Sequence, residues 1–241
     1  MSTSKINSND LHKIDKILRK LANPTQAKLL QRFFKTGKGE YGKGDVFLGL
    51  KVPQLRKIAK QFWTMPLDSV EQLLCSREHE KRMIAVLILV LKYEKLPDIR
   101  RQIFNLYVKN YKNINNWDLV DVTCPHIVDA WLLNKDKAIL YKLSKSNNLW
   151  KKRMAMVATF AFIRENKLAD ALAIAEILLF DKHDLINKAV GWALREVGKK
   201  DLPALLKFLN EYAAHMPRVA LRYSIEKLSE SQKRFYLAKR P

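Results

Sequence analysis

The same helical pattern returns five times along the later two thirds of this chain, at a nearly constant spacing. In each copy one polar residue precedes an apolar run, and these polar residues are Arg82, Asp118, Arg153, Lys188 and Arg218. They lie 36, 35, 35 and 30 residues apart. Apolar side chains recur at i, i+3, i+4 and i+7 within each copy, which indicates amphipathic helices. A repeat of about 35–40 residues predicts an all-α fold, a curved right-handed solenoid of HEAT-like or armadillo-like helical repeats.

The repeats predict one helical-repeat domain over 1–241, with the most regular copies over 75–231. Further helices are expected over 10–35, with a break at Asn23-Pro24, and from Val52-Pro53 onward, because proline suits a first helical turn. Five of the seven glycines fall between Gly37 and Gly49. The segment 36–50 is therefore expected to be a loop or a short hairpin. An irregular globular bundle is the alternative to the solenoid.

Composition narrows the class of protein and of partner. Only 7 Gly and 8 Pro in 241 residues disfavour a turn-rich β-sandwich or barrel. The formal net charge is +21 and the sequence pI is near 9.9. A folded domain this basic points to a polyanionic partner, most commonly nucleic acid. An anionic membrane would need a basic amphipathic segment or an anchor, and the sequence shows neither.

Targeting and metal signals are absent from the sequence. The first residues lack the apolar core of a signal peptide, and the longest apolar run, Met83–Leu91, is shorter than the ~20 residues of a membrane span. Two cysteines, Cys75 and Cys124, form neither a disulfide framework nor a metal motif, and the five histidines are scattered. We expect a cytoplasmic protein without a metal ion or a cofactor.

Four of the five repeat positions are basic: Arg82, Arg153, Lys188 and Arg218. Each is expected to open a helix, where the partial positive charge of the helix N-terminus adds to its own. A row of such cations on one face suits the phosphates of a nucleic acid. A single such residue is more often an ordinary solvated charge, but the set favours phosphate contact. Three basic residues of the same segments complete the candidate DNA contacts: Lys152, Arg195 and Arg222.

The second copy breaks this row with the sequence NNWDLVD, which places Asp118 and Asp121 beside Trp117. A carboxylate on a DNA-binding surface weakens binding, so it calls for an explanation. Asp118 lies in a first helical turn, where the helix dipole favours an acid. Asp121 lies between Val120 and Val122, and it is either a buried structural carboxylate or a reactive group.

Two more tryptophans lie in comparable places in later copies. Trp150 is assigned to the core, whereas Trp192 follows Gly191, which leaves room beside it for a close neighbour. Trp117, Asp121, Arg153 and Trp192 could converge on one concavity from three adjacent repeats. An acid, two aromatic rings and a phosphate-binding arginine suggest chemistry on a DNA sugar.

At these residues the sequence resembles the AlkD family of alkylpurine DNA glycosylases, which are HEAT-like helical arrays. The resemblance runs from DVFLGLKVPQLRKIA to MPRVALRYSIEKL, and its most specific motifs are WDLVD, NNLWKKRMA and INKAVGWALRE. It implies that Asp121 is the catalytic aspartate, that Trp117 and Trp192 are the paired aromatics, and that Arg153 holds a phosphate. Two departures are the pair Asn116-Trp117, where a family member has two tryptophans, and the glycine-rich GKGEYGKGD segment.

The resemblance implies hydrolysis of the N-glycosidic bond of positively charged alkylated purines, such as 3-methyladenine and 7-methylguanine, in double-stranded DNA. Asp121 stabilises the oxocarbenium-like sugar and places a water molecule. The alkylated base is already positively charged while it is bound to the sugar and becomes neutral as it leaves, so it needs no general acid. The resemblance further implies no base-flipping pocket, no strand cleavage and a monomer.

Three other functions are weighed against this one. Gly37 to Lys43 matches G-x-x-x-x-G-K, but Gly44 follows where magnesium binding needs Ser or Thr, and no strand precedes it, so a nucleotide cofactor is not expected. A non-catalytic helical-repeat protein that recognises duplex or branched DNA is the main alternative. A scaffold for an acidic protein is the third, and it predicts a weak response of DNA affinity to salt.

Overall fold

The computed structural model describes residues 8–240, which form fifteen α-helices and one short 3₁₀ helix. Within this range no strand is present, and Val46 and Glu78 form an isolated parallel bridge. The all-α class predicted from the sequence is confirmed. The chain divides into two compact units, Met1–Ile127 and Val128–Pro241.

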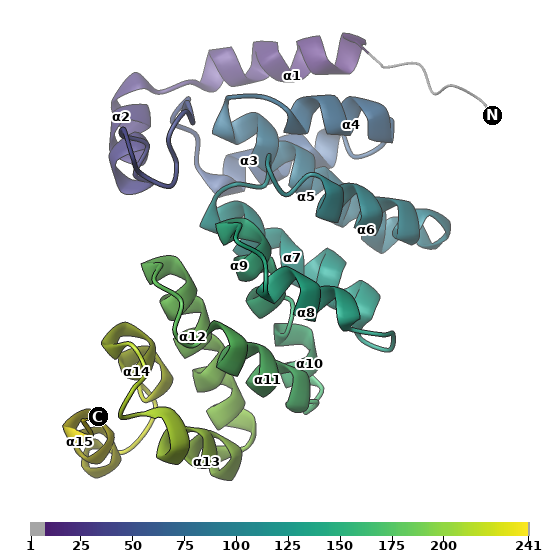
Figure 1. The fold of residues 1–241 in the computed structure, drawn as a ribbon. Coiled ribbons are helices and arrows are strands. Elements are labelled where there is room, and N and C mark those ends of the chain that lie inside the picture. The colour runs from purple at the N-terminus through teal and green to yellow at the C-terminus, as the bar shows by residue number, and fades with distance from the viewer. Residues whose placement is uncertain (1–7, 241) are drawn as a thin grey trace. The chain divides into compact units, whose positions relative to one another are not determined.

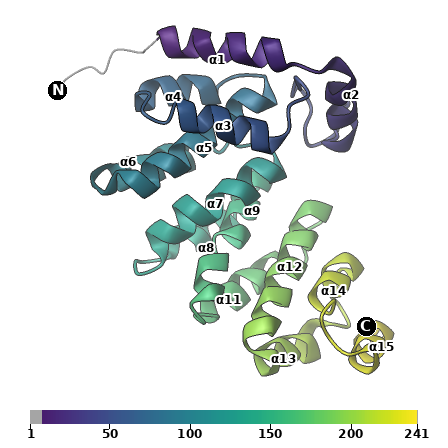
Figure 2. The same ribbon diagram turned by 180° about the vertical axis from the view of Figure 1, so that it is seen from behind.

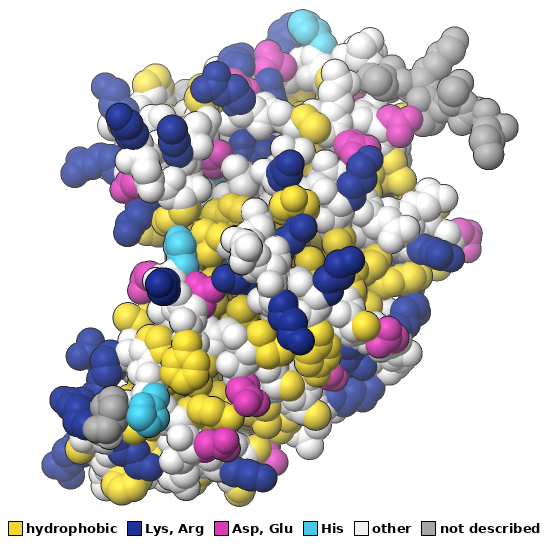
Figure 3. Space-filling model, viewed as in Figure 1, with side chains coloured by type: hydrophobic (Ala, Val, Ile, Leu, Met, Phe, Trp, Pro, Cys, Tyr) yellow, Lys and Arg dark blue, Asp and Glu magenta, His cyan; other side chains and the backbone are white. Residues whose placement is uncertain are grey.

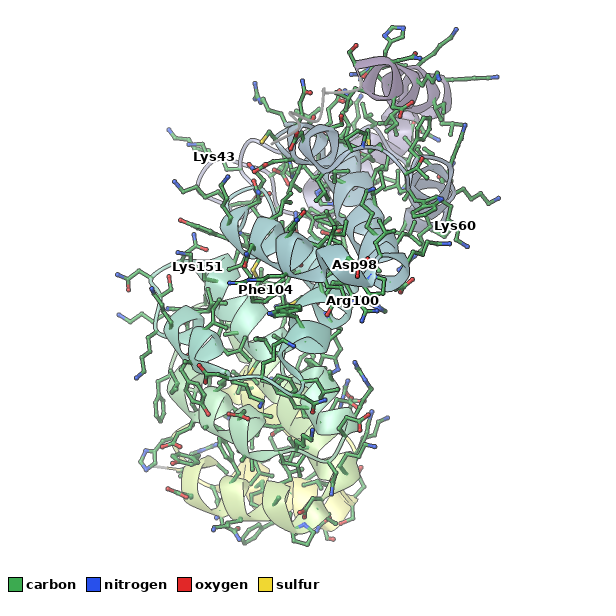
Figure 4. The ribbon with its side chains drawn as sticks, turned by 90° about the vertical axis from the view of Figure 1, so that its right-hand side faces the viewer. Lys43, Lys60, Asp98, Arg100, Phe104 and Lys151 are labelled. Atoms are coloured by element: carbon green, nitrogen blue, oxygen red, sulfur yellow. The ribbon has the colours of Figure 1, made fainter. Side chains whose placement is uncertain are left out.

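In the first unit, α5 is the central helix. Both α3 and α4 pack on it, α6 follows against it, and α1 lies against α4 (Figures 1 and 2). Arg100, at the start of α6, donates from Nε to the carbonyl oxygen of Tyr93 at 2.9 Å (Figure 4). The helices of this unit are α1 (Ser8–Leu21), α2 (Pro24–Phe33), α3 (Val52–Gln61), α4 (Leu67–Leu74), α5 (His79–Lys95), η1 (Pro97–Ile99), α6 (Arg100–Lys109) and the first part of α7 (Trp117–Leu132).

The second unit shows the helix pairs that the repeat spacing predicted. Helices α8 and α9, α11 and α12, and α12 and α13 pack together, and α9, α12 and α14 lie next to one another as successive second helices. Helix α10 adds a short turn against α12. The helices are α8 (Ala138–Ser144), α9 (Leu149–Val157), α10 (Phe160–Arg164), α11 (Ala169–Leu178), α12 (Asp184–Lys200), α13 (Leu202–Tyr212), α14 (Arg218–Ser224) and α15 (Glu230–Ala238).

Several helices begin at side chains that cap their free backbone N–H groups. Asn23 accepts a hydrogen bond from the N–H of Gln26 before α2, where Pro24 occupies the first turn, so the expected break is confirmed. Asn148 caps α9 in the same way, and Asp201 caps α13. Each of these caps accepts hydrogen bonds from backbone N–H groups that the first helical turn leaves without an intrahelical partner.

The glycine-rich segment 36–50 is a loop of turns that is anchored at its far end by Glu80 of α5. The buried Glu80 Oε1 accepts hydrogen bonds from the backbone N–H groups of Leu48, Gly49 and Leu50 at 2.9, 2.8 and 3.3 Å. Gly49 has φ +91°, and a Cβ there would lie 2.2 Å from the carbonyl oxygen of Asn23. Only glycine fits this close approach of the loop to the start of α2.

Among the described helices, none is both long and apolar enough to span a membrane. Cys75 is exposed and Cys124 is buried, and neither forms a disulfide bond.

Candidate functional site

Helix α7 begins with the two candidate residues of the first unit. Asn116 is buried, and its Oδ1 accepts a hydrogen bond from the N–H of Trp117 at 2.8 Å. Asp121 follows Trp117 by four residues, one helical turn, and its side chain is partly exposed. Pro125 interrupts the helical hydrogen-bond pattern one turn later. The carboxylate and the indole are therefore carried by adjacent turns of one helix.

Trp117 is partly buried and packs on an aromatic cluster of the first unit. Its ring stacks on Phe34, with ring centroids 5.2 Å apart, and Phe34 stacks on Phe47 at 5.0 Å. Phe33 lies edge-on to Trp117 at 5.9 Å and leaves 62% of its surface exposed. Phe33 and the partly buried Trp117 are thus the members of this cluster that reach the surface, whereas Phe34 and Phe47 are buried.

The two acids of the WDLVD motif lie in different environments. Asp118 is 7% exposed, and its Oδ2 lies 2.8 Å from Nε2 of His79 on α5. Its Oδ1 accepts the N–H of Leu119 at 2.8 Å. Asp118 is thus the buried structural carboxylate, whereas the partial exposure of Asp121 leaves it accessible to a ligand.

Arg82, the first of the basic row, has its partners inside the protein. It is 3% exposed, and its guanidinium lies 2.6 Å from Oδ2 of Asp45. It also donates to the carbonyl oxygens of Ser76 and Arg77 at 2.9 and 3.1 Å. We therefore leave Arg82 out of the proposed DNA contacts.

Arg153 of the second unit is also buried, at 5% exposure. Its Nη1 donates to the carbonyl oxygen of Leu185 at 2.5 Å, in the first turn of α12. This bond fixes the direction of the guanidinium and links α9 to α12. Trp150, one turn earlier on α9, is 6% exposed, which confirms its assignment to the core.

Trp192 lies on α12 and is half-buried. Its ring packs on Phe160 with a centroid distance of 4.2 Å. A Cβ on Gly191 would lie 2.5 Å from the carbonyl oxygen of Ala220 and 2.5 Å from Cβ of Tyr223. The space that the glycine leaves is thus filled by α14, which holds the backbone beside Trp192 in place.

The remaining basic candidates keep part of their surface exposed. Lys188 pairs with Asp184 one turn away, and 41% of its side chain is exposed. Lys152 pairs with Asp181 at 2.6 Å, and Arg195 pairs with Glu226.

Arginine side chains gather at the start of α14. Arg222 is exposed, and Arg218 is half-buried and donates to the carbonyl oxygen of Leu237 at 2.6 Å. Burial and the nearby guanidinium groups of Arg240 and Arg222 lower the pKa of Arg218. Like charges in this proximity repel one another, and an anion relieves that repulsion. Figure 3 shows Lys and Arg side chains over α14 and α15, and, in the first unit, over α2 and the loop after it.

The candidates fall in both units, with Trp117 and Asp121 in the first and Arg153 and Trp192 in the second. The convergence of these four residues on one concavity stays a prediction. Within 8–240, no group of His, Cys, Asp and Glu side chains is suited to hold a metal ion.

Sequence reasoning missed His79, Phe33 and Phe34. His79 and Glu80 precede Met83 and Ile84 by one helical turn, so they fall on the apolar face of α5. This spacing was the sequence signal that could have predicted their burial.

Comparison with known proteins finds a family that matches most of the chain and a solved structure with a similar fold. The family described as DNA alkylation repair enzyme matches residues 14–228. A solved structure, described as a predicted DNA alkylation repair enzyme from Enterococcus faecalis, is similar with a TM-score of 0.69 and 18% sequence identity. The match covers 87% of this chain and 97% of that chain. At this identity the likeness supports the fold alone. No curated protein matches the chain.

Proposed function

The chain belongs to the family of DNA alkylation repair enzymes, and from that premise we propose that it is a monofunctional DNA glycosylase. Its proposed reaction is hydrolysis of the N-glycosidic bond of positively charged alkylated purines, 3-methyladenine and 7-methylguanine, in duplex DNA. The observation that carries the proposal is the partly exposed carboxylate of Asp121, one turn from the indole of Trp117 on a chain of net charge +21. The protein is proposed to act as a monomer and without a cofactor.

The proposed hydrolysis requires a negatively charged carboxylate and does not require a general acid to protonate the leaving base. An alkylated purine that already carries a positive charge leaves as a neutral base when the bond from its nitrogen to C1′ of the sugar breaks. The positive charge then develops on the sugar, where the negative charge of Asp121 stabilises it. A water molecule held by Asp121 adds its oxygen to C1′ and gives up a proton to the carboxylate or to solvent.

The two tryptophans are proposed to contact the charged nucleotide. An indole face attracts a cation by ~0.5–2 kcal/mol, depending on how well water is excluded. Trp117 is held by Phe34 and Trp192 by Phe160, so neither ring must be ordered when DNA binds. We propose that these contacts act on the sugar and the lesion within the duplex, without base flipping.

The phosphate contacts are proposed for basic residues that retain exposed surface. In the second unit these are Lys188, Arg218 and Arg222, with Lys152 and Arg195 as ion-paired neighbours. Arg153 is an exception to this criterion, because it is only 5% exposed; we retain it as a proposed phosphate contact on the resemblance of its NNLWKKRMA motif, with its guanidinium oriented by the bond to Leu185. In the first unit five exposed cations lie on α2 and the following loop, where Figure 4 labels Lys43: Lys28, Arg32, Lys35, Lys38 and Lys43.

The proposal is tested by incubating the protein with methylated duplex DNA and measuring the purines released. We expect 3-methyladenine and 7-methylguanine above the buffer blank, and an intact sugar–phosphate strand until alkali is added. Release equal to the blank, with salt-dependent duplex binding, would instead identify a DNA-binding protein without chemistry. Binding that barely responds to salt would favour an acidic protein partner.

A second prediction concerns the exposed ring beside Trp117. Phe33→Ala is expected to weaken binding of a duplex that contains an abasic-site analogue by about 5- to 150-fold, because stacking on an aromatic ring contributes about 1–3 kcal/mol. Fluorescence anisotropy measures the dissociation constant. Phe235→Ala is the matched control, since Phe235 is 58% exposed and lies edge-on to Tyr236 at 5.1 Å. Equal affinity of both variants would exclude Phe33 from the DNA contact.

A further inference from the structure

A cluster of charged side chains is buried behind the first turn of α7. Asp45 of the glycine-rich segment, His79 and Arg82 of α5, and Asp118 of α7 are all 7% exposed or less. Nε2 of His79 lies 2.8 Å from Oδ2 of Asp118, and Nδ1 lies 3.5 Å from Oδ2 of Asp45. A charged imidazole here joins two carboxylates that come from segments far apart in the sequence.

The same imidazole also belongs to the aromatic cluster. It stacks on Phe47 at 4.5 Å and on Phe34 at 5.3 Å, and Phe34 stacks on Trp117 at 5.2 Å. His79 is therefore connected to the first turn of α7 in two ways. It forms a hydrogen bond with Asp118, and its ring stacks on Phe34, which in turn stacks on Trp117.

We propose that His79 is a positioning residue that fixes the first turn of α7, and with it the indole of Trp117 and the carboxylate of Asp121. The proposal rests on the proposed glycosylase function for its consequence in catalysis. Asp118 is the link, because it bonds to His79 on one side and caps the helix N–H of Leu119 on the other. His79 touches no proposed substrate atom, so its effect is exerted through these neighbours.

The charges that face the ring determine its protonation. Asp45 faces it from the glycine-rich segment, Arg82 from α5 and Asp118 from α7, while the segment after α2 contributes the ring of Phe34. Burial disfavours the charged imidazole, but the carboxylates of Asp118 and Asp45 outweigh burial and raise the pKa of His79 to about 9. A raised pKa in the folded state stabilises the fold below pH 6.5, and this contribution is lost as the pH rises through about 9.

The test compares His79→Gln with His126→Gln, which alters an exposed histidine of α7. Single-turnover excision from methylated duplex is measured between pH 7 and 10, with the blank subtracted, beside the dissociation constant for undamaged duplex. We expect His79→Gln to slow excision at pH 7.5 by about ten- to a hundredfold while the dissociation constant is unchanged. The wild-type rate should fall above pH 9, and this fall should be absent in His79→Gln and kept in His126→Gln. If His79→Gln excises at the wild-type rate, or if its rate falls above pH 9 as the wild-type rate does, the proposal is overturned.

A spectroscopic measurement separates this inference from the glycosylase function. The indole N–H resonance of Trp117, assigned by its loss in Trp117→Phe, should shift in the wild-type protein with a midpoint near pH 9. If no purine is released but this shift is seen, the glycosylase function fails and the positioning of Trp117 by His79 stands. An indole resonance that does not respond to pH overturns the positioning role. This titration uses the wild-type protein, so it decides the question even where His79→Gln does not fold.

Discussion

Asp121→Asn is expected to slow the release of 3-methyladenine from methylated duplex DNA by about two to four orders of magnitude. The amide has the shape of the carboxylate but carries no negative charge, so it neither stabilises the cationic sugar nor accepts a proton from water. Duplex binding should persist or tighten, because the change removes a negative charge next to the proposed path of the phosphates. Single-turnover excision and fluorescence anisotropy measure the two effects separately.

Asp98→Asn is the matched control for this experiment. Asp98 is an exposed acid of the first unit, in the first turn of η1, so the change in net charge is the same as in Asp121→Asn (Figure 4). Its excision rate should equal that of the wild-type protein. Full excision by Asp121→Asn would contradict the proposed role of this carboxylate and leave Asp121 a structural group.

Much of the fold could be predicted because its determinants are local. Proline at Asn23-Pro24 and at Val52-Pro53 marks the start of a helix in the sequence, and the structure begins α2 at Pro24 and α3 at Val52. The repeat positions each fall within the first five residues of a helix, namely α5, α7, α9, α12 and α14. The spacing of the repeats in the sequence was sufficient to predict where these helices begin, since each repeat is one pair of helices.

The environment of each repeat position could not be predicted in the same way. Arg82 and Lys188 are equivalent by spacing, yet Arg82 is buried against Asp45 while 41% of the Lys188 side chain is exposed. The partner of Arg82 lies 37 residues earlier in the glycine-rich segment, in a loop whose path no periodicity describes. Likewise, the pairing of His79 with Asp118 depends on the packing of α5 and α7 and not on any local motif.

Arg82→Met is expected to lower the free energy of unfolding by about 3–5 kcal/mol, because it removes the nearest cation of the buried Asp45 carboxylate and leaves only the imidazole of His79 at 3.5 Å. The Asp45–Arg82 pair is 2.6 Å long, and both side chains are at most 4% exposed. The change also removes the donor for the carbonyl oxygens of Ser76 and Arg77. Urea unfolding of the full chain followed by circular dichroism measures the loss.

Arg19→Met is the control, since Arg19 pairs with Asp15 and Glu78 but half of its side chain is exposed. A pair in that position contributes about 0–1 kcal/mol. Adding Asp45→Asn to Arg82→Met should recover part of the lost stability, because the double variant no longer buries a carboxylate that has lost its nearest cation. Equal unfolding midpoints for Arg82→Met and Arg19→Met would contradict the structural role of Arg82.

The salt dependence of DNA affinity distinguishes this structural role from a phosphate contact. A lysine or arginine that neutralises one phosphate adds about 0.9 to the slope of log affinity against log salt. At a temperature where Arg82→Met is folded, its slope should therefore equal that of the wild-type protein, whereas Arg222→Met should lose about that amount. A reduced slope in Arg82→Met would show that Arg82 contacts a phosphate, because the loss of a buried arginine without such a contact does not change the number of counterions released.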